Sequence, residues 1–446
     1  MSWLFSSTAP AEGSAATTTG SSASDLLHVP AERAPAAELF GPLVPEDTEW
    51  LQGGGFITET QIWYGTTPSG GLVMIQIIHS GVGMWYPQIQ FTFRYFDPSA
   101  NPPIKIWKSV NVTNFVVPAP AGTNKVIKPD RRSCKSDQFS ITVDPDQPNT
   151  YKIEGTYDKD VQVSLEYTRA AGVPGWKLGA GPQGGMTYFG ALKSAKPTGS
   201  KLPDTTSGTD GFAVHRFWPR CHVKGIVRTG KEIADLSGST GMFVHAIQGM
   251  RPNLVAARWN FANFQSPASS DPDQSVSLTM MEFTTTSYYG TQKVNIGSVV
   301  VGDKLIAVTA GSRDGKAGSS ATHLEAVVDQ ETSYSVPQSI RFDWAGPLID
   351  SPSSVAQAEI LLELDPLAQS KGKYEGKGLI EKVDVLAEIP YLVKKVINVV
   401  AGTKPYIYQW LNPVTAKITI PSTTETGSTR ELTVDGVLFN EATWIS

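Results

Sequence analysis

The stretch Gln88-Ile89-Gln90-Phe91-Thr92-Phe93-Arg94-Tyr95 decides the fold class of this chain. Its apolar and aromatic side chains alternate strictly with polar ones. Successive side chains of a β-strand point to opposite faces, so this period of two predicts a half-buried strand with one apolar and one polar face. A helix would instead repeat its apolar positions every three or four residues. The stretch therefore predicts a strand at the wall of a core.

Comparable short runs recur along the chain, separated by clusters of turn residues. They lie at residues 72–79, 104–110, 139–143, 161–167, 242–248, 254–264, 276–283, 294–301, 304–309, 340–344 and 418–420. Many evenly spaced strands without alternating helices are typical of antiparallel barrels or sandwiches. One short helix is expected at 390–400, where Pro390 suits a first helical turn and apolar residues share one face. We expect this helix to cover a second barrel.

The length of 446 residues suits two domains and a tail rather than one core. We predict a tail at 1–48, a first domain at 49–200, a linker rich in Gly, Pro, Ser and Thr at 201–212, and a second domain at 213–446. A weak sequence similarity between Gln76–His79 and His245–Gln248 indicates that the two domains are related.

The tail begins with Trp3, Leu4 and Phe5 and then becomes rich in Ser, Thr, Ala and Gly. Such a composition offers too little apolar surface to offset the entropy of ordering, so we expect disorder. Three large apolar residues at the tip of a flexible arm can insert into a membrane interface. The alternative is a disordered end without a role.

Composition and charge exclude several classes of function. The net charge of −5 comes without a basic stripe, which argues against a nucleic-acid partner. Two cysteines, Cys134 and Cys221, support neither a disulfide framework nor a Cys-rich metal site. No secretory signal and no apolar run near the roughly 20 residues of a membrane span occur. We therefore expect a cytoplasmic protein with reduced thiols.

Sequence motifs give no support to catalysis by a cofactor, a metal or a nucleophile. Residues 179–184 fit G-x-G-x-x-G formally, but Pro182 removes an amide and no helical pattern follows. His323-Leu324-Glu325 lacks the P-C-x-x-C of a zinc deaminase. No metalloprotease, hydrolase or Walker motif occurs. We assign no catalytic residue, no metal site and no cofactor.

Five histidines, in contrast, lie in or beside predicted strands: His79, His215, His222, His245 and His323. A barrel interior could bring two or three of them together to bind zinc or move a proton. A strand histidine is more often a hydrogen-bonded structural group. His245 lies in the middle of its strand and is the first to test. The many aromatic residues either line a cavity or fill the barrels, as side chains do in small barrels.

Several longer motifs mark the second half of the chain, at residues 215–221 (HRFWPRC), 241–252 (GMFVHAIQGMRP), 280–285 (MMEFTT) and 439–446 (FNEATWIS). Together with QFTFRYF at 90–96 they resemble signatures of the fungal survival-factor family, and the resemblance extends from residue 49 to 446. It implies two lipocalin-like antiparallel β-barrels in tandem and survival under oxidative stress. It also implies transfer of ceramide between the endoplasmic reticulum and the Golgi, with an amphipathic N-terminal helix that binds membranes. In this chain the apolar tip is only three residues long.

The sequence thus predicts a protein that holds a ceramide-like lipid in a barrel cavity. Each buried methylene contributes about 0.8 kcal/mol, so long alkyl chains need an apolar enclosure in water. The candidate ligand-binding residues are His245, Gln248, Arg258, Trp259 and Asn260. The expected location is the cytoplasm, with peripheral association with Golgi and endoplasmic reticulum membranes, and the nucleus as an additional place.

Two alternatives remain open at this point. Double lipocalin-like proteins include cyclases that fold a polyene in their pocket, and such sites depend on shape more than on acid–base groups. A regulatory or structural interaction protein would instead have filled barrels without a cavity. The sequence predicts neither the oligomeric state nor which barrel binds a lipid.

Overall fold

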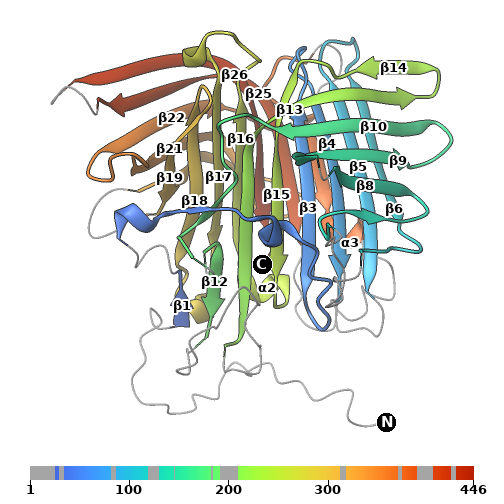
Figure 1. Ribbon diagram of the computed structural model, residues 1–446, viewed down its shortest axis with the longest axis horizontal. Coiled ribbons are helices and arrows are strands. Elements are labelled where there is room, and N and C mark those ends of the chain that lie inside the picture. The colour runs from blue at the N-terminus through green and yellow to red at the C-terminus, as the bar shows by residue number, and fades with distance from the viewer. Residues whose placement is uncertain are drawn as a thin grey trace.

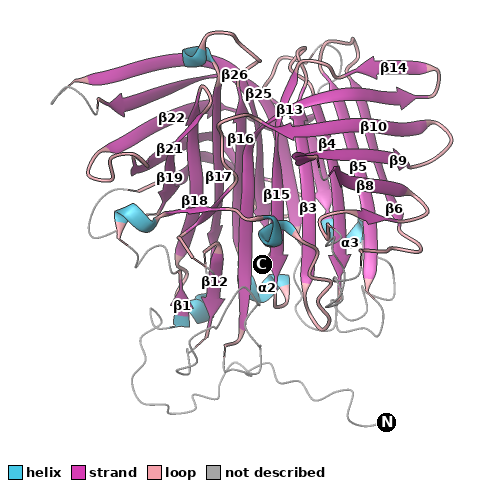
Figure 2. Cartoon of the chain, viewed as in Figure 1, coloured by secondary structure: helices cyan, strands magenta, loops and turns pink. Residues whose placement is uncertain are grey.

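The computed structural model describes residues 26–29, 35–81, 87–118, 130–144, 146–181, 184–190, 209–311, 318–369, 374–388, 405–422 and 428–445. Nearly all regular structure in these ranges is β-strand (Figure 2). The strands form two curled sheets that stand side by side (Figure 1). All pairs of strands are antiparallel except one short pair in the second sheet. The prediction of an almost all-β chain with two antiparallel sheets is confirmed.

The first sheet contains ten strands along its main path, in an order that does not follow the sequence. The path is β6 (Ile104–Asn111), β5 (Gln88–Asp97), β4 (Leu72–Ser80), β3 (Thr58–Thr66), β15 (Ser239–Gln248), β13 (Gly211–Thr229), β10 (Val161–Arg169), β9 (Gln147–Thr156), β8 (Phe139–Asp144) and β7 (Cys134–Lys135). Five short strands attach to this path: β1 (Leu27–His28), β2 (Phe40–Pro42), β11 (Trp176–Leu178), β12 (Met186–Phe189) and β14 (Glu232–Asp235). A bridge between Val116 and Lys135 joins the chain beyond β6 to β7, so the sheet curls back on itself.

The second sheet repeats this plan with the later part of the chain. Its path is β19 (Lys304–Ala310), β18 (Lys293–Val301), β17 (Val276–Thr284), β16 (Arg258–Gln265), β26 (Thr429–Trp444), β25 (Tyr406–Pro421), β22 (Val355–Glu363), β21 (Ser335–Pro347) and β20 (Ser320–Val328). The parallel pair β23 (Asp365–Gln369) and β24 (Gly378–Asp384) extends it beside β25. A bridge from Ala307 in β19 to Leu348, just after β21, again brings the two ends of the path together.

Helices are short. The described ones are η2 (Ala36–Glu38), η3 (Pro45–Thr48), α2 (Pro252–Val255), η5 (Pro272–Gln274), η6 (Ser287–Tyr289) and α3 (Val385–Glu388). The predicted helix at 390–400 lies outside the described residues. Residues 35–48, which the sequence placed in the tail, form η2, β2 and η3, and β2 pairs with β11 of the first sheet.

The change from one sheet to the other does not fall at the predicted linker, 201–212. Strands β13 and β15, which the sequence placed in the second domain, belong to the first sheet. The change comes between Gln248, the end of β15, and Arg258, the start of β16. A Gly- and Pro-rich composition marks a surface connection, but the hydrogen-bonding partners of the next strand depend on contacts far along the chain.

Four apolar clusters follow from the alternation of side chains along the strands, and the three larger ones matter here. One lies within the first sheet, one within the second, and one between the two sheets. On β3, Trp63 belongs to the cluster within the first sheet, whereas Tyr64 belongs to the cluster between the sheets. There the Tyr64 ring lies 5.3 Å from that of Phe261 and 5.5 Å from that of Phe439 on the second sheet.

One arginine also joins the sheets. Arg220 lies on β13, at a register irregularity in its pairing with β15, and is 1% exposed. Its guanidinium reaches into the second sheet and donates hydrogen bonds to oxygens of Gln265 (3.3 Å), Val276 (2.9 Å) and Ser277 (3.1 Å). Burial lowers its pKa to about 10, which still leaves it charged at neutral pH.

Candidate functional site

Polar residues inside the first sheet gather at one end of its strands. Glu59 and Gln61 on β3 share a face with Trp63 because they are four and two residues away from it. The registers β13–β15–β3 place Arg216 and His245 in the same row as Gln61. Residues 44–52, here called the strap, run along this end and include η3. The strap and these side chains form the candidate site.

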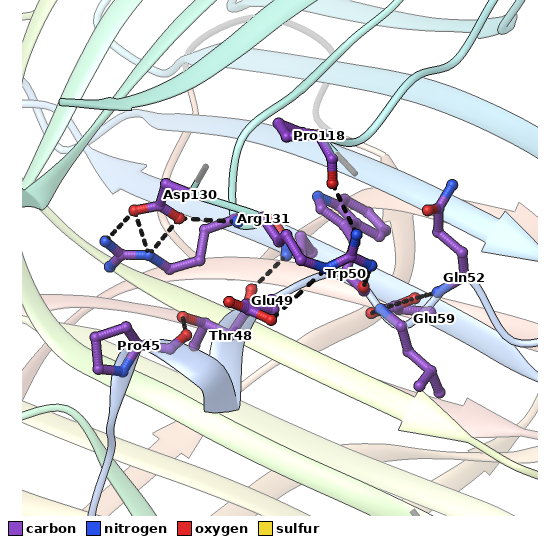
Figure 3. Close-up of polar contacts among 12 residues, drawn as sticks. Pro45, Thr48, Glu49, Trp50, Gln52, Glu59, Pro118, Asp130 and Arg131 are labelled. Atoms are coloured by element: carbon purple, nitrogen blue, oxygen red, sulfur yellow. Dashed lines mark hydrogen bonds and ion pairs between the residues drawn. The ribbon is translucent and has the colours of Figure 1, made fainter. Parts of the chain in front are cut away.

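Glu59 anchors the strap from inside the sheet. Its carboxylate accepts hydrogen bonds from the backbone N–H of Leu51 (2.8 and 3.0 Å) and of Gln52 (2.9 Å). Figure 3 shows the contact with Gln52. The third partner is His245, whose Nε2 lies 2.8 Å from Glu59 Oε1. Both side chains are fully buried, at 0% exposure. All the polar partners of this carboxylate are therefore protein groups.

The hydrogen bonds of His245 determine where its protons lie. Its Nδ1 is 3.1 Å from the carbonyl oxygen of Asp47, which can only accept, so Nδ1 carries a hydrogen. A second proton must lie between Nε2 and Glu59, because two lone pairs would repel each other at that distance. The pair is therefore neutral as a whole, with one proton shared between an acid and a base.

Asp47 ties the strap to the neighbouring strands through charge. Its carboxylate lies 2.9 Å from Lys177 Nζ on β11 and 3.5 Å from an Arg216 nitrogen on β13. Arg216 also donates to the Asp47 carbonyl oxygen. All three side chains are buried, so these ion pairs are little screened by solvent.

Trp50 is the apolar part of the strap and points into the first sheet. The side chain is 1% exposed and lies in the same cluster as Trp63. Its ring is 5.5 Å from that of Phe115 and 6.4 Å from that of His245. The Arg131 guanidinium holds Trp50 in place by donating hydrogen bonds to Trp50 O (3.1 Å) and Pro118 O (2.7 Å) (Figure 3).

Several polar atoms beneath the strap lack a hydrogen-bond partner. They are Gln61 Oε1, Trp63 Nε1 and His79 Nδ1, all buried. Gln61 uses its amide nitrogen to donate to Thr48 O of the strap, at 3.1 Å, while its oxygen stays unpaired. An unpaired buried polar atom is costly, so each of these atoms is a place where a further polar group could bind.

The interior next to these atoms is packed with rings. Trp63 lies 5.3 Å from Tyr151 and 5.2 Å from Phe243, and Tyr151 lies 5.0 Å from Trp218. A cavity of about 330 Å³ opens elsewhere, between loops of the first sheet and strands of the second. Its lining is Ser69, Gly70, Pro98, Tyr374, Glu375, Gly376, Leu411, Pro413 and Val437. Another, of about 130 Å³, lies beside η2. Neither of these two cavities lies inside the first sheet, where these rings pack against one another.

Comparison with known proteins places this chain in a family by its sequence. The sequence model of the Svf1 family matches residues 1–446. The chain belongs to the Svf1 family. A relative in Aspergillus fumigatus, named ceramide-binding protein svf1, is 33% identical over 460 residues and covers 100% of both chains. One of the same name in Emericella nidulans is 31% identical and covers 91% of this chain and 90% of its own.

A solved structure shares the fold of this Svf1-family chain. The crystal structure of CghA has a TM-score of 0.53 and covers 88% of this chain and 89% of its own. Only 10% of the residues are identical, so the likeness concerns the fold alone. The resemblance to the survival-factor family that the sequence motifs indicated is confirmed by the family match.

The predicted ligand-binding residues of this Svf1-family chain do not form one site. His245 lies inside the first sheet, and Gln248 is half-buried at the end of the same strand. Arg258 is exposed at the start of β16. Trp259 faces the cluster between the sheets, 4.8 Å from the Phe283 ring. Asn260 contacts His323 (2.8 Å) and Glu282 (3.4 Å) of the second sheet. Two adjacent strand residues point to opposite faces, and β15 and β16 belong to different sheets.

The sequence analysis missed Asp47, Trp50, Glu59 and Gln61. Glu59 and Gln61 alternate with Thr58 and Thr60, so polar residues occupy both faces of this stretch and hide its inner face. Asp47 and Trp50 lie in a segment assigned to the tail or its boundary. The other predicted functional residues, Trp3, Leu4 and Phe5, lie outside the described residues.

Two kinds of feature are absent from the described part of the chain. No helix there is long and apolar enough to cross a membrane. No group of three or more His, Cys, Asp or Glu side chains is placed to hold a metal ion within the same ranges.

His215, near Trp259, leads to a prediction about pH. Its ring lies among aromatic rings, including Trp259 at 5.9 Å, and burial lowers its pKa from 6.5 to about 4. Between these values the unfolded chain binds a proton that the folded protein does not. Stability is therefore present above pH 6.5 and is lost as the pH falls towards 4, by up to about 3 kcal/mol.

We expect His215→Phe to reduce this acid sensitivity, because the ring remains but the titrating group is gone. Urea unfolding of both proteins at pH 7 and at pH 4.5 measures the difference. Part of the decline should remain in the variant, since burial also lowers the pKa of His323 to about 4. An identical pH dependence in the two proteins would contradict the assignment.

Proposed function

We propose that this protein binds a ceramide and acts as a binding protein rather than as an enzyme. One observation carries the proposal: the relatives at 31–33% identity over nearly the whole chain are named ceramide-binding proteins. The match extends over both sheets and their connections, so the ligand class of these relatives is a reasonable assignment for a chain of the same length.

The acid and base groups of the candidate site are closed to a substrate while the strap is in place. His245 and Glu59, the acid–base pair of the candidate site, are fully buried and face each other. A general acid or base must come within hydrogen-bond reach of the proton it transfers. With both groups engaged by the protein, no substrate atom can reach that proton while the strap is in place.

Size sets a requirement on the site. Pockets for small molecules enclose roughly 300–1,000 Å³, and a ceramide with two long alkyl chains belongs at the upper end. The cavity between the sheets, at about 330 Å³, is at the lower end. Binding a whole ceramide therefore requires that some covering residues move.

We extend the proposal to transport. A protein that encloses ceramide can carry it through water between the endoplasmic reticulum and the Golgi, with peripheral contact at each membrane and support for survival under oxidative stress. A cytoplasmic location, with some of the protein at these membranes and in the nucleus, is part of the same proposal.

A ceramide-binding assay with the full-length protein tests the proposal. We expect saturable binding of a fluorescent short-chain ceramide with one molecule per chain, and transfer of ceramide from donor to acceptor vesicles in proportion to protein concentration. A diacylglycerol of equal chain length, which lacks the amide, is the matched control. Absence of saturable binding, or equal binding of the diacylglycerol, would contradict the proposal.

A further inference from the structure

We infer that the amide and hydroxyl groups of the ceramide bind to Glu59, Gln61 and His245, in the place that the strap now occupies. The strap is then an internal stand-in for the ligand, and it must leave for the lipid to enter. The inference rests on the proposed function, since it locates the ceramide whose binding is proposed there.

The chemistry of the strap matches that of a ceramide head. The strap presents two N–H donors, from Leu51 and Gln52, to the Glu59 carboxylate. It presents two carbonyl acceptors, Asp47 O to His245 and Thr48 O to Gln61. A ceramide head carries one amide N–H, one amide carbonyl and two hydroxyls, which together can supply two donors and two acceptors. Replacement of the strap by the ceramide head would leave the Glu59 carboxylate with hydrogen-bond partners, which a buried charge requires.

The apolar part of the ligand has a counterpart as well. Trp50 places its indole in the apolar cluster within the first sheet, at 1% exposure. Withdrawal of this side chain with the strap would open space against Phe115 and the rings of that cluster. An alkyl chain that enters there recovers the apolar contacts that Trp50 gives up.

The unpaired polar atoms provide an independent observation. Gln61 Oε1, Trp63 Nε1 and His79 Nδ1 lie inside this sheet without a partner while the strap is in place. The strap therefore satisfies the interior only in part. A ligand with two hydroxyl groups, each able to donate and accept, can supply partners that a peptide segment does not.

The strap is attached in a way that allows it to separate as a unit. Its described backbone makes one hydrogen bond to the backbone of another segment, from Trp50 N to Arg131 O at 3.2 Å. Its other links to the sheet run through side chains, and they include the buried ion pairs of Asp47 with Lys177 and Arg216, which must break when the strap leaves. No ladder of strand pairing has to break. The Arg131 guanidinium also donates hydrogen bonds to Trp50 O and to Pro118 O, and so links the strap to the segment that contains Pro118.

Hydrogen exchange of the full-length protein, with and without short-chain ceramide, tests the inference without any substitution. We expect ceramide to increase exchange at the amides of Leu51 and Gln52, because their hydrogen bonds to Glu59 are replaced. A peptide from β25, in the second sheet, serves as the internal reference. A bound ligand ordinarily protects a binding protein, so faster exchange in this one segment is a distinctive result.

Two substitutions with opposite expected effects sharpen the test. Arg131→Met loosens the strap without touching the Glu59 carboxylate, and should raise the apparent ceramide affinity about three- to tenfold by making the open form more populated. Gln61→Met keeps the side-chain volume and removes the amide, and should lower the affinity by about the same factor. Circular dichroism of each variant confirms that it is folded before the affinities are compared.

The outcomes separate the inference from the proposed function. Ceramide binding with faster exchange at residues 51–52 supports both. Ceramide binding with unchanged or slower exchange there overturns the inference and leaves the proposed function standing. Failure of the wild-type protein to bind ceramide overturns both. An affinity that neither substitution changes, in folded protein, also counts against this location.

Discussion

Replacement of Glu59 by alanine is expected to lower the free energy of unfolding by about 3–5 kcal/mol, the usual cost of removing one member of a buried, hydrogen-bonded pair. The substitution leaves the amides of Leu51 and Gln52 and the Nε2 of His245 without their common acceptor. The Nε2 of His245 cannot turn to solvent while the strap stays in place, because its side chain is fully buried.

Urea unfolding followed by tryptophan fluorescence measures this loss. Glu59→Gln should cost less than Glu59→Ala, since the amide oxygen can still accept one hydrogen bond from the strap. The matched control is Glu363→Ala, which removes a carboxylate that is 75% exposed and pairs with Lys377 at the surface. That control should leave the unfolding midpoint unchanged. A loss of under about 1 kcal/mol for Glu59→Ala would mean that the strap does not depend on this carboxylate.

Arg220→Met is expected to weaken the protein by about 2–4 kcal/mol, because oxygens of the second sheet lose a charged donor in a buried place. The guanidinium now donates to oxygens of Gln265, Val276 and Ser277. Gln265 belongs to β16, and Val276 and Ser277 belong to β17. The effect should appear at the contact between the two sheets rather than within either one.

The measurement is again urea unfolding, with hydrogen exchange at residues 265–277 as a local reading. Arg228→Met is the matched control, because Arg228 lies on the same strand, β13, and is exposed. It should change neither quantity. Equal free energies of unfolding for the two variants would show that the contacts of Arg220 with the second sheet do not stabilise the protein.

The strands were predictable because the information for them is local. The run from Gln88 to Tyr95 predicts a strand, and β5 extends over Gln88–Asp97. The inward and outward sides of such a run follow from a period of two, which needs no knowledge of the partner strands. By contrast, Glu59 and Gln61 stand among threonines, and that stretch shows no apolar face to indicate which side is buried.

Among the predicted site residues, His245 lies in the candidate site, and the rest of that site had no local signal. The partners of His245 are 186 and 198 residues away along the chain, at Glu59 and Asp47. Polar residues separated by such distances carry no common motif. The ligand role of His245 stays a prediction, which the exchange experiment addresses.

The amino-acid sequence alone determined that the chain is almost entirely β, that it forms more than one core, and that it resembles the survival-factor family, since alternation and motifs are properties of neighbouring residues. Only the tertiary structure decided that β13 and β15 belong to the first sheet, and that the strap closes over a buried acid–base pair. The reason is physical: strand pairing and ion pairing join segments that are far apart in the chain, and the free energy of each contact exists only once the fold has brought its members together.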